Sequence, residues 1–147
     1  MGKRCNLLNK AQITISKGQK LFFTESAGPE DNSNIPPKGI DLFRILNSYK
    51  SIWLNVIGNE IAAHLLLNDQ MTPIFCAFEE KSSILPLYGN VKIYHKRNAG
   101  FSTFSFMFKP LIEARKIIEM DVDLIQNFGG MAVPFIEFNS EKTHLND

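Results

Sequence analysis

The chain has 147 residues, of which 44% are hydrophobic and 21% charged, and its formal net charge is +1. This composition predicts one globular domain spanning residues 1–147, with loosely ordered ends at 1–9 and 140–147. The balanced charge argues against nucleic acid or an anionic membrane as a partner. No secretory signal and no run of about 20 apolar residues is apparent, so we expect a soluble cytoplasmic protein.

The two cysteines give no sign of a metal site or a redox pair. Cys5 and Cys76 lie far apart, and neither belongs to a C-x-x-C motif or has histidines at ligand spacing. Cys76 lies inside the apolar run 74–78, which predicts a buried thiol. No bound metal is expected.

The first part of the chain predicts aromatic and extended segments. The isoleucines within 13–15 fit either a helical turn or a short strand. Residues 20–26 (K-L-F-F-T-E-S) predict a strand rich in aromatic side chains. Residues 34–39 must be extended, because Ile35 and Pro36 each precede a proline and are excluded from the helical region.

The middle of the chain alternates strands with one helix. Residues 40–46 fit a short turn or strand, and 51–57 (S-I-W-L-N-V-I) predict a strong strand. Apolar residues at a 3.6-residue period predict a helix over 59–68. Two further strands, 71–79 and 84–94, are joined by a short loop, which favours an antiparallel hairpin.

The last third predicts a helical layer and further strands. Residues 98–109 are rich in phenylalanine and fit a short helix or an irregular layer. Alternating apolar residues from Ile118 onward favour a strand, and 135–138 fit a last edge segment. Because the strands follow one another without regular helical crossovers, the expected fold is mainly β (α+β): an antiparallel barrel or half-barrel with flanking helices.

Two segments have the form of a ligand site. Gly58 and Asn59 open the predicted helix, whose free N–H groups and dipole would attract a phosphate, although the same residues fit an ordinary helix cap. Pro36 and Pro37 stiffen the backbone before Lys38, so this segment suits either the edge of a flat ligand or a structural edge strand.

Other polar residues do not assemble into a recognisable catalytic group. His64 on the predicted helix fits a surface or packing role, and Asp121 and Asp123 fit a solvated strand face. Arg44 could contact a phosphate or pair with Glu60, and the sequence does not choose between them. No Ser-His-Asp or Cys-His arrangement is present, and the catalytic residues are unknown.

Taken in order, several motifs resemble the pyridoxamine 5'-phosphate oxidase-related FMN-binding family, and in particular its small single-domain branch. The motifs are F-F-T-E-S-A-G, N-I-P-P-K-G-I-D-L-F-R-I-L-N, W-L-N-V-I-G-N-E-I-A-A-H-L, I-F-C-A-F-E and I-L-P-L-Y-G-N-V. The resemblance covers residues 20–96 and extends more weakly over 117–134. The order of the five motifs is specific for this family, whereas each motif alone is not.

This resemblance implies a split β-barrel that forms a homodimer, with FMN in a groove at the subunit interface. It implies that residues 37–39 lie near the flavin and that Asn55 and 58–60 form the ribityl and phosphate end. The strands of Phe75 and Tyr88 would contribute to the interface. The cofactor-binding candidates are Pro37, Lys38, Gly39, Trp53, Asn55, Gly58, Asn59, Glu60, Phe75 and Tyr88.

The chain also departs from the family pattern. Pro36 stands in place of a serine and Pro86 in place of an arginine. The phosphate turn carries Asn59 and Glu60 where the oxidase has Arg and Lys. Residues 127–147 do not match the oxidase's substrate-binding residues, so true pyridoxamine 5'-phosphate oxidase activity is not expected.

The resulting hypothesis is a flavin-dependent oxidoreductase acting on an unidentified small substrate. The alternative is a non-catalytic flavin carrier or sensor, since both prolines remove groups expected near the cofactor. A third option is a relative that binds haem or a deazaflavin, for which His64 or His95 would be the axial ligand available to haem.

Overall fold

A computed structural model describes residues 3–27, 33–39, 41–56, 69–79, 83–111 and 114–142. Strands dominate this part of the chain, and two helices accompany them. The strands are β1 (Lys3–Cys5), β2 (Phe22–Ala27), β3 (Ser33–Asn34), β4 (Pro37–Lys38), β5 (Phe43–Asn47), β6 (Lys50–Asn55), β7 (Gln70–Ala77), β8 (Ser83–His95) and β9 (Lys116–Asn127). The helices are α1 (Lys10–Gly18) and α3 (Ala99–Ser105).

The strands form one antiparallel sheet in the order β3-β2-β7-β8-β9-β6-β5, with β1 paired to β9 and β4 to β2. The sheet curls until β2 approaches β5 without pairing to it. At that seam the ring centroids of Phe22 and Phe43 lie 5.3 Å apart. Among the described residues, side-chain contacts rather than backbone hydrogen bonds therefore join β2 to β5. The fold is a mainly antiparallel split β-barrel, which confirms the expected fold class.

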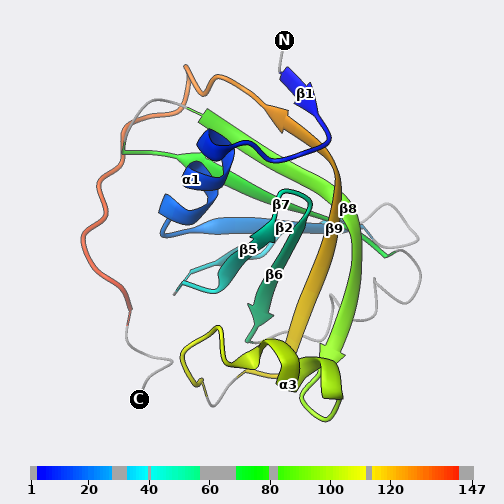
Figure 1. Cartoon of the computed structure of the whole chain (residues 1–147). Coiled ribbons are helices and arrows are strands. Elements are labelled where there is room, and N and C mark those ends of the chain that lie inside the picture. The colour runs from blue at the N-terminus through cyan, green and yellow to red at the C-terminus, as the bar shows by residue number, and fades with distance from the viewer. Residues whose placement is uncertain are drawn as a thin grey trace.

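The curvature comes from the two longest strands, β8 and β9, which sweep along one side of the molecule (Figure 1). Their register shifts between Tyr88 and Gly89, where the strand bulges. A Cβ atom at position 89 would lie 2.0 Å from the backbone oxygen of Asp121. Only glycine allows the two backbones to approach this closely.

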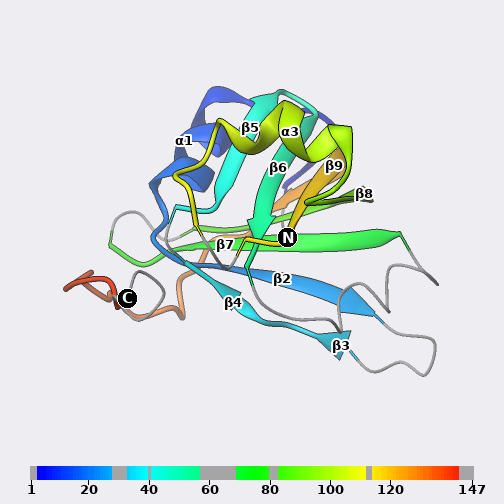
Figure 2. The same cartoon turned by 90° about the horizontal axis from the view of Figure 1, so that it is seen from below.

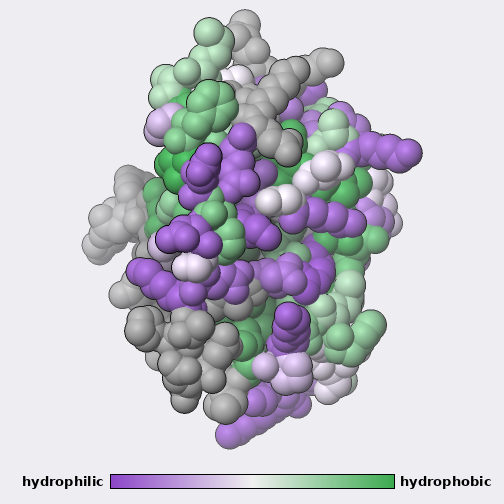
Figure 3. All heavy atoms as spheres, turned by 90° about the vertical axis from the view of Figure 1, so that its left-hand side faces the viewer, coloured by the Kyte–Doolittle hydropathy of each residue, from purple (hydrophilic) through white to green (hydrophobic). Residues whose placement is uncertain are grey.

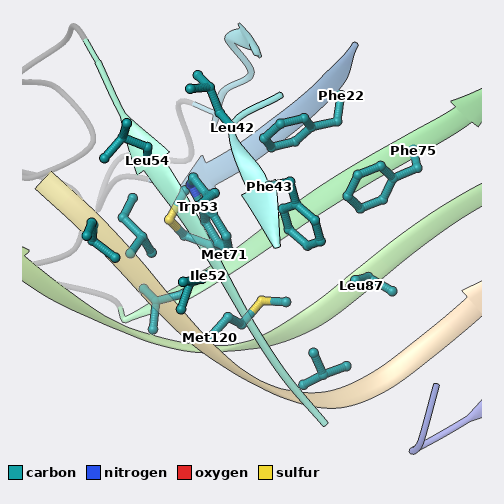
Figure 4. Packing of buried hydrophobic residues seen from close by; sticks show 14 of the residues in the cluster. Phe22, Leu42, Phe43, Ile52, Trp53, Leu54, Met71, Phe75, Leu87 and Met120 are labelled. Atoms are coloured by element: carbon teal, nitrogen blue, oxygen red, sulfur yellow. The ribbon is translucent and has the colours of Figure 1, made fainter. Parts of the chain in front are cut away.

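Aromatic side chains join the two sides of the barrel (Figure 4). The Phe75 ring on β7 stacks on Phe22 at 5.4 Å and meets Phe43 edge-on at 4.7 Å between centroids. Phe43 in turn stacks on Trp53 of β6 at 5.9 Å. Such offset and edge-to-face pairs contribute roughly 0.5–1.5 kcal/mol each beyond area burial. The cluster is therefore the central part of the core.

The two helices lie at opposite ends of the barrel in Figure 1, and Figure 2 shows β3 and β4 on the far side of β2 from both of them. α1 begins with a capping box. The Asn9 side chain accepts from the Gln12 backbone N–H at 2.9 Å, and the Gln12 side chain accepts from the Asn9 N–H at 3.0 Å. This reciprocal pairing allows Gln12 to be buried.

The C-terminal segment after β9 runs along the outside of the barrel. It is tied at the end of β7, where the Ile136 N–H donates to the Phe78 carbonyl at 3.1 Å and the Phe138 N–H to a Glu79 carboxylate oxygen. Its apolar side chains Met131 and Phe135 remain exposed. On the face seen in Figure 3, hydrophilic side chains cover much of the middle and hydrophobic ones gather towards one upper corner.

The strand predictions are largely confirmed. Those at 20–26, 51–57, 71–79 and 84–94 agree with β2, β6, β7 and β8 to within two residues at each end, and β7 and β8 form the expected antiparallel hairpin. The alternation from Ile118 onward belongs to β9.

Several ambiguous segments are now assigned. Residues 13–15 lie in α1, 43–46 of the segment 40–46 lie in β5, and 98–109 contain α3. The edge segment expected at 135–138 is wrong, because these residues are mostly exposed and form no strand. The predicted helix over 59–68 lies outside the described residues.

At the N-terminus, where a loosely held segment is predicted, the structure places strand β1. Lys3–Cys5 pairs with the end of β9 in antiparallel register. Leu8 follows in the core with 5% exposure, and its N–H donates to the Ser48 carbonyl at 2.8 Å.

Candidate functional site

The proline-rich segment forms strand β4 on the edge of β2. Phe22 is the register partner of Lys38, and Phe23 is the partner of Pro37. Because successive side chains point to opposite faces of a strand, Lys38 shares the interior face with Phe22, and Pro37 lies on the outer face. Pro36 also takes part in this sheet, since its carbonyl accepts the Thr24 N–H at 3.2 Å. The segment is thus extended, as the sequence predicts.

Lys38 and Asn55 form a buried polar pair. The Lys38 ammonium donates to the Asn55 side-chain oxygen at 2.8 Å, and the two residues are only 8% and 3% exposed. Asn55 is the last residue of β6, and its carbonyl accepts the Arg115 N–H at 3.2 Å. The curl of the sheet therefore brings together two residues that lie 17 positions apart in the sequence, one on β4 and one at the end of β6.

The Lys38 ammonium has no carboxylate partner among the described residues. Burial lowers the pKa of Lys38, because desolvation disfavours its charged form. An ammonium can donate three hydrogen bonds, and one neutral amide oxygen uses only one of them. The barrel interior therefore contains a buried cationic donor that an anionic or carbonyl-bearing ligand would satisfy.

Two further candidates, Trp53 and Phe75, are fully buried in the aromatic core. Their rings stack on Phe43 and Phe22, so their faces are occupied by protein. The Trp53 indole N–H finds no hydrogen-bond partner within the described part of the chain. Trp53 and Asn55 lie two residues apart on β6 and therefore point to the same interior face.

Tyr88 lies on the opposite face of the sheet from Phe75. Ile74 pairs with Pro86 on one face and Phe75 with Leu85 on the other, and Tyr88 shares the face of Pro86. The structure thus does not bring Tyr88 and Phe75 together.

The half-buried Tyr88 belongs to a polar group that links β8, β9 and β1. Its hydroxyl lies 3.1 Å from the side-chain amide of Gln126. With the amide oriented to donate to Tyr88, its oxygen accepts from Arg4 Nε at 2.9 Å and Nη2 at 3.1 Å.

The remaining site candidates divide between Gly39 and the predicted phosphate turn. A Cβ atom at position 39 would make only ordinary contact, 3.5 Å from the Lys20 carbonyl oxygen. The described residues therefore do not require a glycine there. Gly58, Asn59 and Glu60 lie outside the described residues.

Arg44 makes contacts that the sequence analysis did not consider. It forms a bidentate pair with Asp41, at 2.9 Å from Nη1 and 3.1 Å from Nη2. Its Nε donates to the Met107 carbonyl at 3.1 Å, and its guanidinium lies 5.0 Å from the centroid of the Phe108 ring. We call Asp41 and Arg44 the clasp, because they tie the start of β5 to the segment after α3.

Other polar candidates stay apart from the Lys38–Asn55 pair. Asp121 and Asp123 are exposed, which confirms the solvated face. His95 is exposed at the end of β8. Cys76 is half-buried, and desolvation raises the pKa of its thiol, which favours an unreactive side chain.

The described residues hold no group of three or more histidine, cysteine or acidic side chains that could bind a metal. Within the same part of the chain, no helix is long and apolar enough to cross a membrane.

Sequence reasoning missed the Lys38–Asn55 pair and the clasp. The pair depends on how far the sheet curls, which strand patterns do not reveal. The clasp has a local signal, since Asp41 and Arg44 are three residues apart, but that spacing suggests a contact only in a helix or turn. The Asn9–Gln12 capping box was visible as N-x-x-Q ahead of the isoleucines and would have identified α1.

No family model matches the sequence. The chain is 31% identical over 127 residues to a pyridoxamine 5'-phosphate oxidase family protein of Aspergillus flavus, ustO. The match covers 81% of this chain and 51% of that protein, so the chain spans about half the length of the curated relative it matches.

Solved structures with the same fold are similar over most of their length. A candidate pyridoxamine 5'-phosphate oxidase from Lactobacillus delbrueckii has a TM-score of 0.66 at 10% identity, covering 82% of this chain and 94% of that one. HupZ from Group A Streptococcus has a TM-score of 0.65 at 13% identity, covering 83% and 95%. The FAD-binding protein of Mycobacterium smegmatis has a TM-score of 0.61 at 12% identity, covering 83% and 96%. The resemblance to this split-barrel family is therefore confirmed.

Proposed function

We propose that this chain, a split-barrel protein of the pyridoxamine 5'-phosphate oxidase-related family, binds a flavin, and that the flavin is FMN. The buried Lys38 ammonium is the main observation in support, because its one described partner is the neutral Asn55 oxygen. A relative of the same fold is described as an FAD-binding protein, which supports the flavin class but not the choice between FMN and FAD.

The residues of the pair fit a flavin in chemical character. The Lys38 ammonium has unused donor capacity that suits a phosphate or the electron-rich carbonyl edge of the ring. Asn55 fixes the direction of the ammonium, and β4 holds its backbone in an extended form. Trp53 and Phe75 would then support the site through packing rather than contact the flavin, because both are fully buried.

When bound, the flavin would supply the redox chemistry, exchanging electrons and a hydride with a small substrate. The protein's contribution would be binding, orientation and exclusion of water. Lys38 would hold a positive charge beside the cofactor, and a lowered pKa makes this charge sensitive to alkaline pH. The other buried ionisable side chain among the described residues, Glu119, pairs with Lys50 at 3.7 Å and not with Lys38.

A non-catalytic flavin carrier or sensor remains the second candidate function, and Pro36 favours it. The proline has neither a backbone N–H nor a hydroxyl, and its carbonyl is engaged by the Thr24 N–H. Position 36 therefore offers a bound ring no donor, so the site would hold a flavin with fewer groups tuning its reactivity.

We also propose that two copies of the chain form a homodimer. The outer face of the sheet carries the half-buried apolar side chains of Phe23, Ile74 and Leu124 beside Tyr88. Pro86, next to Ile74 in the register, adds no charge to this face. A contiguous apolar sheet face is typical of a surface that packs against a partner.

The flavin proposal is tested by adding FMN or FAD to the purified protein and recording the flavin absorbance. We expect a shifted and structured flavin band at micromolar concentrations, with FMN bound more tightly than FAD. Anaerobic reduction with NADH or NADPH and reoxidation with candidate acceptors then separates the two functions. Rapid turnover supports an oxidoreductase, whereas stable binding without turnover supports a carrier. The absence of any spectral change with both flavins contradicts the proposal.

The dimer is tested with Ile74→Lys, which places a charge in the middle of the apolar face. Analytical ultracentrifugation should show a dimer for the unmodified protein and a monomer for the variant. Lys92→Glu changes an exposed residue of β8 further along the strand and serves as the matched control. If the unmodified protein is a monomer, the proposed dimer interface is contradicted.

A further inference from the structure

A hollow outside the barrel lies between the start of β5, the segment after α3 and the C-terminal segment. It encloses about 240 Å³, which is below the 300–1,000 Å³ of typical sites for drug-sized ligands, so only a small molecule would fit. Its lining residues come from all three segments: Asp41, Leu42, Phe108, Lys109, Pro110, Leu111 and Glu141. Neither member of the Lys38–Asn55 pair lines it.

The inner wall of the hollow is apolar and fixed in place. Leu42 and Phe108 are only 5% and 7% exposed, and Leu111 is half-buried beside them. The Leu42 carbonyl accepts the Leu54 N–H at 3.0 Å, which holds this wall to β6. An apolar side chain of a ligand would lose its contact with water against this wall.

The clasp joins two sides of the hollow. Arg44 donates hydrogen bonds to Asp41 on one side and to the Met107 carbonyl on the other, where its guanidinium also faces the Phe108 ring. Asp41 itself has a φ of 54°, a left-handed conformation that an L-residue adopts at a cost. The bidentate contact stabilises that conformation. The hollow is therefore pre-formed rather than dependent on a ligand for its shape.

The charges at the rim are of both signs. The Asp41 carboxylate is neutralised by Arg44. Lys109 and Glu141 are exposed and form no ion pair within the described part of the chain. One cation and one anion therefore remain for a ligand beside an apolar wall.

We propose that this hollow binds a small zwitterion with an apolar side chain, of the class of the apolar amino acids. Lys109 pairs with its carboxylate, Glu141 pairs with its ammonium group, and the side chain rests on Leu42 and Phe108. A ligand of single charge would leave one rim charge unmatched, and a longer apolar molecule would exceed the volume. This site is independent of the proposed flavin binding.

The test is a titration of the flavin-free protein with L-phenylalanine, monitored by the backbone amide chemical shifts of residues 41, 42, 108, 109 and 111. We expect saturable shifts at millimolar concentration. Phenethylamine lacks the carboxylate and hydrocinnamate lacks the ammonium group, so each should bind about two- to fivefold more weakly, the effect of one exposed ion pair.

The variants assign each charge to its partner. Lys109→Gln should weaken the binding of L-phenylalanine about two- to fivefold and leave the binding of phenethylamine unchanged. Glu141→Gln should weaken the binding of L-phenylalanine by a similar factor and leave the binding of hydrocinnamate unchanged. Glu137→Gln, on the same C-terminal segment but outside the hollow, is the matched control. Equal binding of all three ligands, or no saturable shift with L-phenylalanine, overturns the proposal.

Discussion

The Lys38–Asn55 pair and the clasp begin only three residues apart in the sequence, at Lys38 and Asp41, but their charges are balanced in opposite ways. In the Lys38–Asn55 pair a buried ammonium meets one neutral oxygen, and no described carboxylate balances its charge. In the clasp, Arg44 uses Nε and both terminal nitrogens on protein groups, while Asp41 is 74% exposed. The clasp is complete without a ligand, whereas the pair is not.

This difference distinguishes polar side chains that stabilise the fold from polar side chains that bind a ligand. A charge that is buried without an opposite charge lowers stability, and proteins retain such groups mainly at sites with a function. A half-buried arginine whose Nε and both terminal nitrogens have protein partners stabilises its loop without a ligand. Substitutions in the pair should therefore affect flavin binding and stability together, whereas those in the clasp should affect stability and leave flavin binding nearly unchanged.

The largest effect is expected from Asn55→Leu, which leaves the Lys38 ammonium buried without its partner. We expect the free energy of unfolding to fall by about 2–3 kcal/mol, the value of a hydrogen bond to a charged group. The double variant Lys38→Met/Asn55→Leu removes both polar groups and should recover most of that loss. Urea denaturation of the four proteins in this cycle measures the coupling. A double variant as unstable as Asn55→Leu would show that the pair is not a unit.

Removing the guanidinium with Arg44→Ala should cost less. The exposed ion pair and the contact with the Phe108 ring together suggest a loss of about 1–2 kcal/mol in the free energy of unfolding. Flavin affinity should change less than about threefold, because this residue is occupied by the clasp. Arg97→Ala, in an exposed turn, is the control. A flavin affinity that falls more than tenfold in Arg44→Ala would place the arginine in the flavin site after all.

The backbone at Asp41 gives a smaller effect that can be isolated by a matched pair. Asp41→Gly and Asp41→Ala both lose the contact with Arg44, but only glycine adopts a φ of 54° without strain. The glycine variant should therefore be more stable than the alanine variant by about 1 kcal/mol. Thermal or urea unfolding compares them directly, and equal stabilities would mean that the loop relaxes out of the left-handed conformation.

The smallest effect is a pH dependence of stability. Burial lowers the pKa of Lys38 below its unfolded value of 10.5, so between the two values the unfolded chain binds more protons than the folded one. The contribution of Lys38 to stability therefore rises with pH through that window. The unmodified protein should therefore gain stability relative to Lys38→Met as the pH approaches 10.5. Lys96→Met, at an exposed position, is the control.

The sequence predicts the strands well because their patterns are local. Alternation in β8 and β9 and the consecutive prolines before Lys38 constrain each segment without knowledge of the rest. The fold class followed from these strands and from the order of motifs. Residues 135–138 were mistaken for a strand because apolar composition does not distinguish an edge strand from an exposed segment.

The site is only partly readable from the sequence. The resemblance singles out Lys38 and Asn55, but their contact depends on the curl of the sheet. Composition cannot reveal that Phe75 faces the core and Tyr88 the outside, since this follows from the register of β7 with β8. The ion pair of Arg44 with Asp41 forms where Asp41 has a left-handed backbone, and a residue other than glycine gives no sign of this conformation in the sequence.

An FMN titration of the unmodified protein beside Lys38→Met tests whether the Lys38 ammonium binds a flavin. Flavin absorbance or fluorescence measures both affinities at neutral pH. We expect the variant to stay folded and to bind FMN about ten- to a hundredfold more weakly, as for a lost charge-assisted hydrogen bond. Equal affinity of the two proteins for FMN would contradict this expectation.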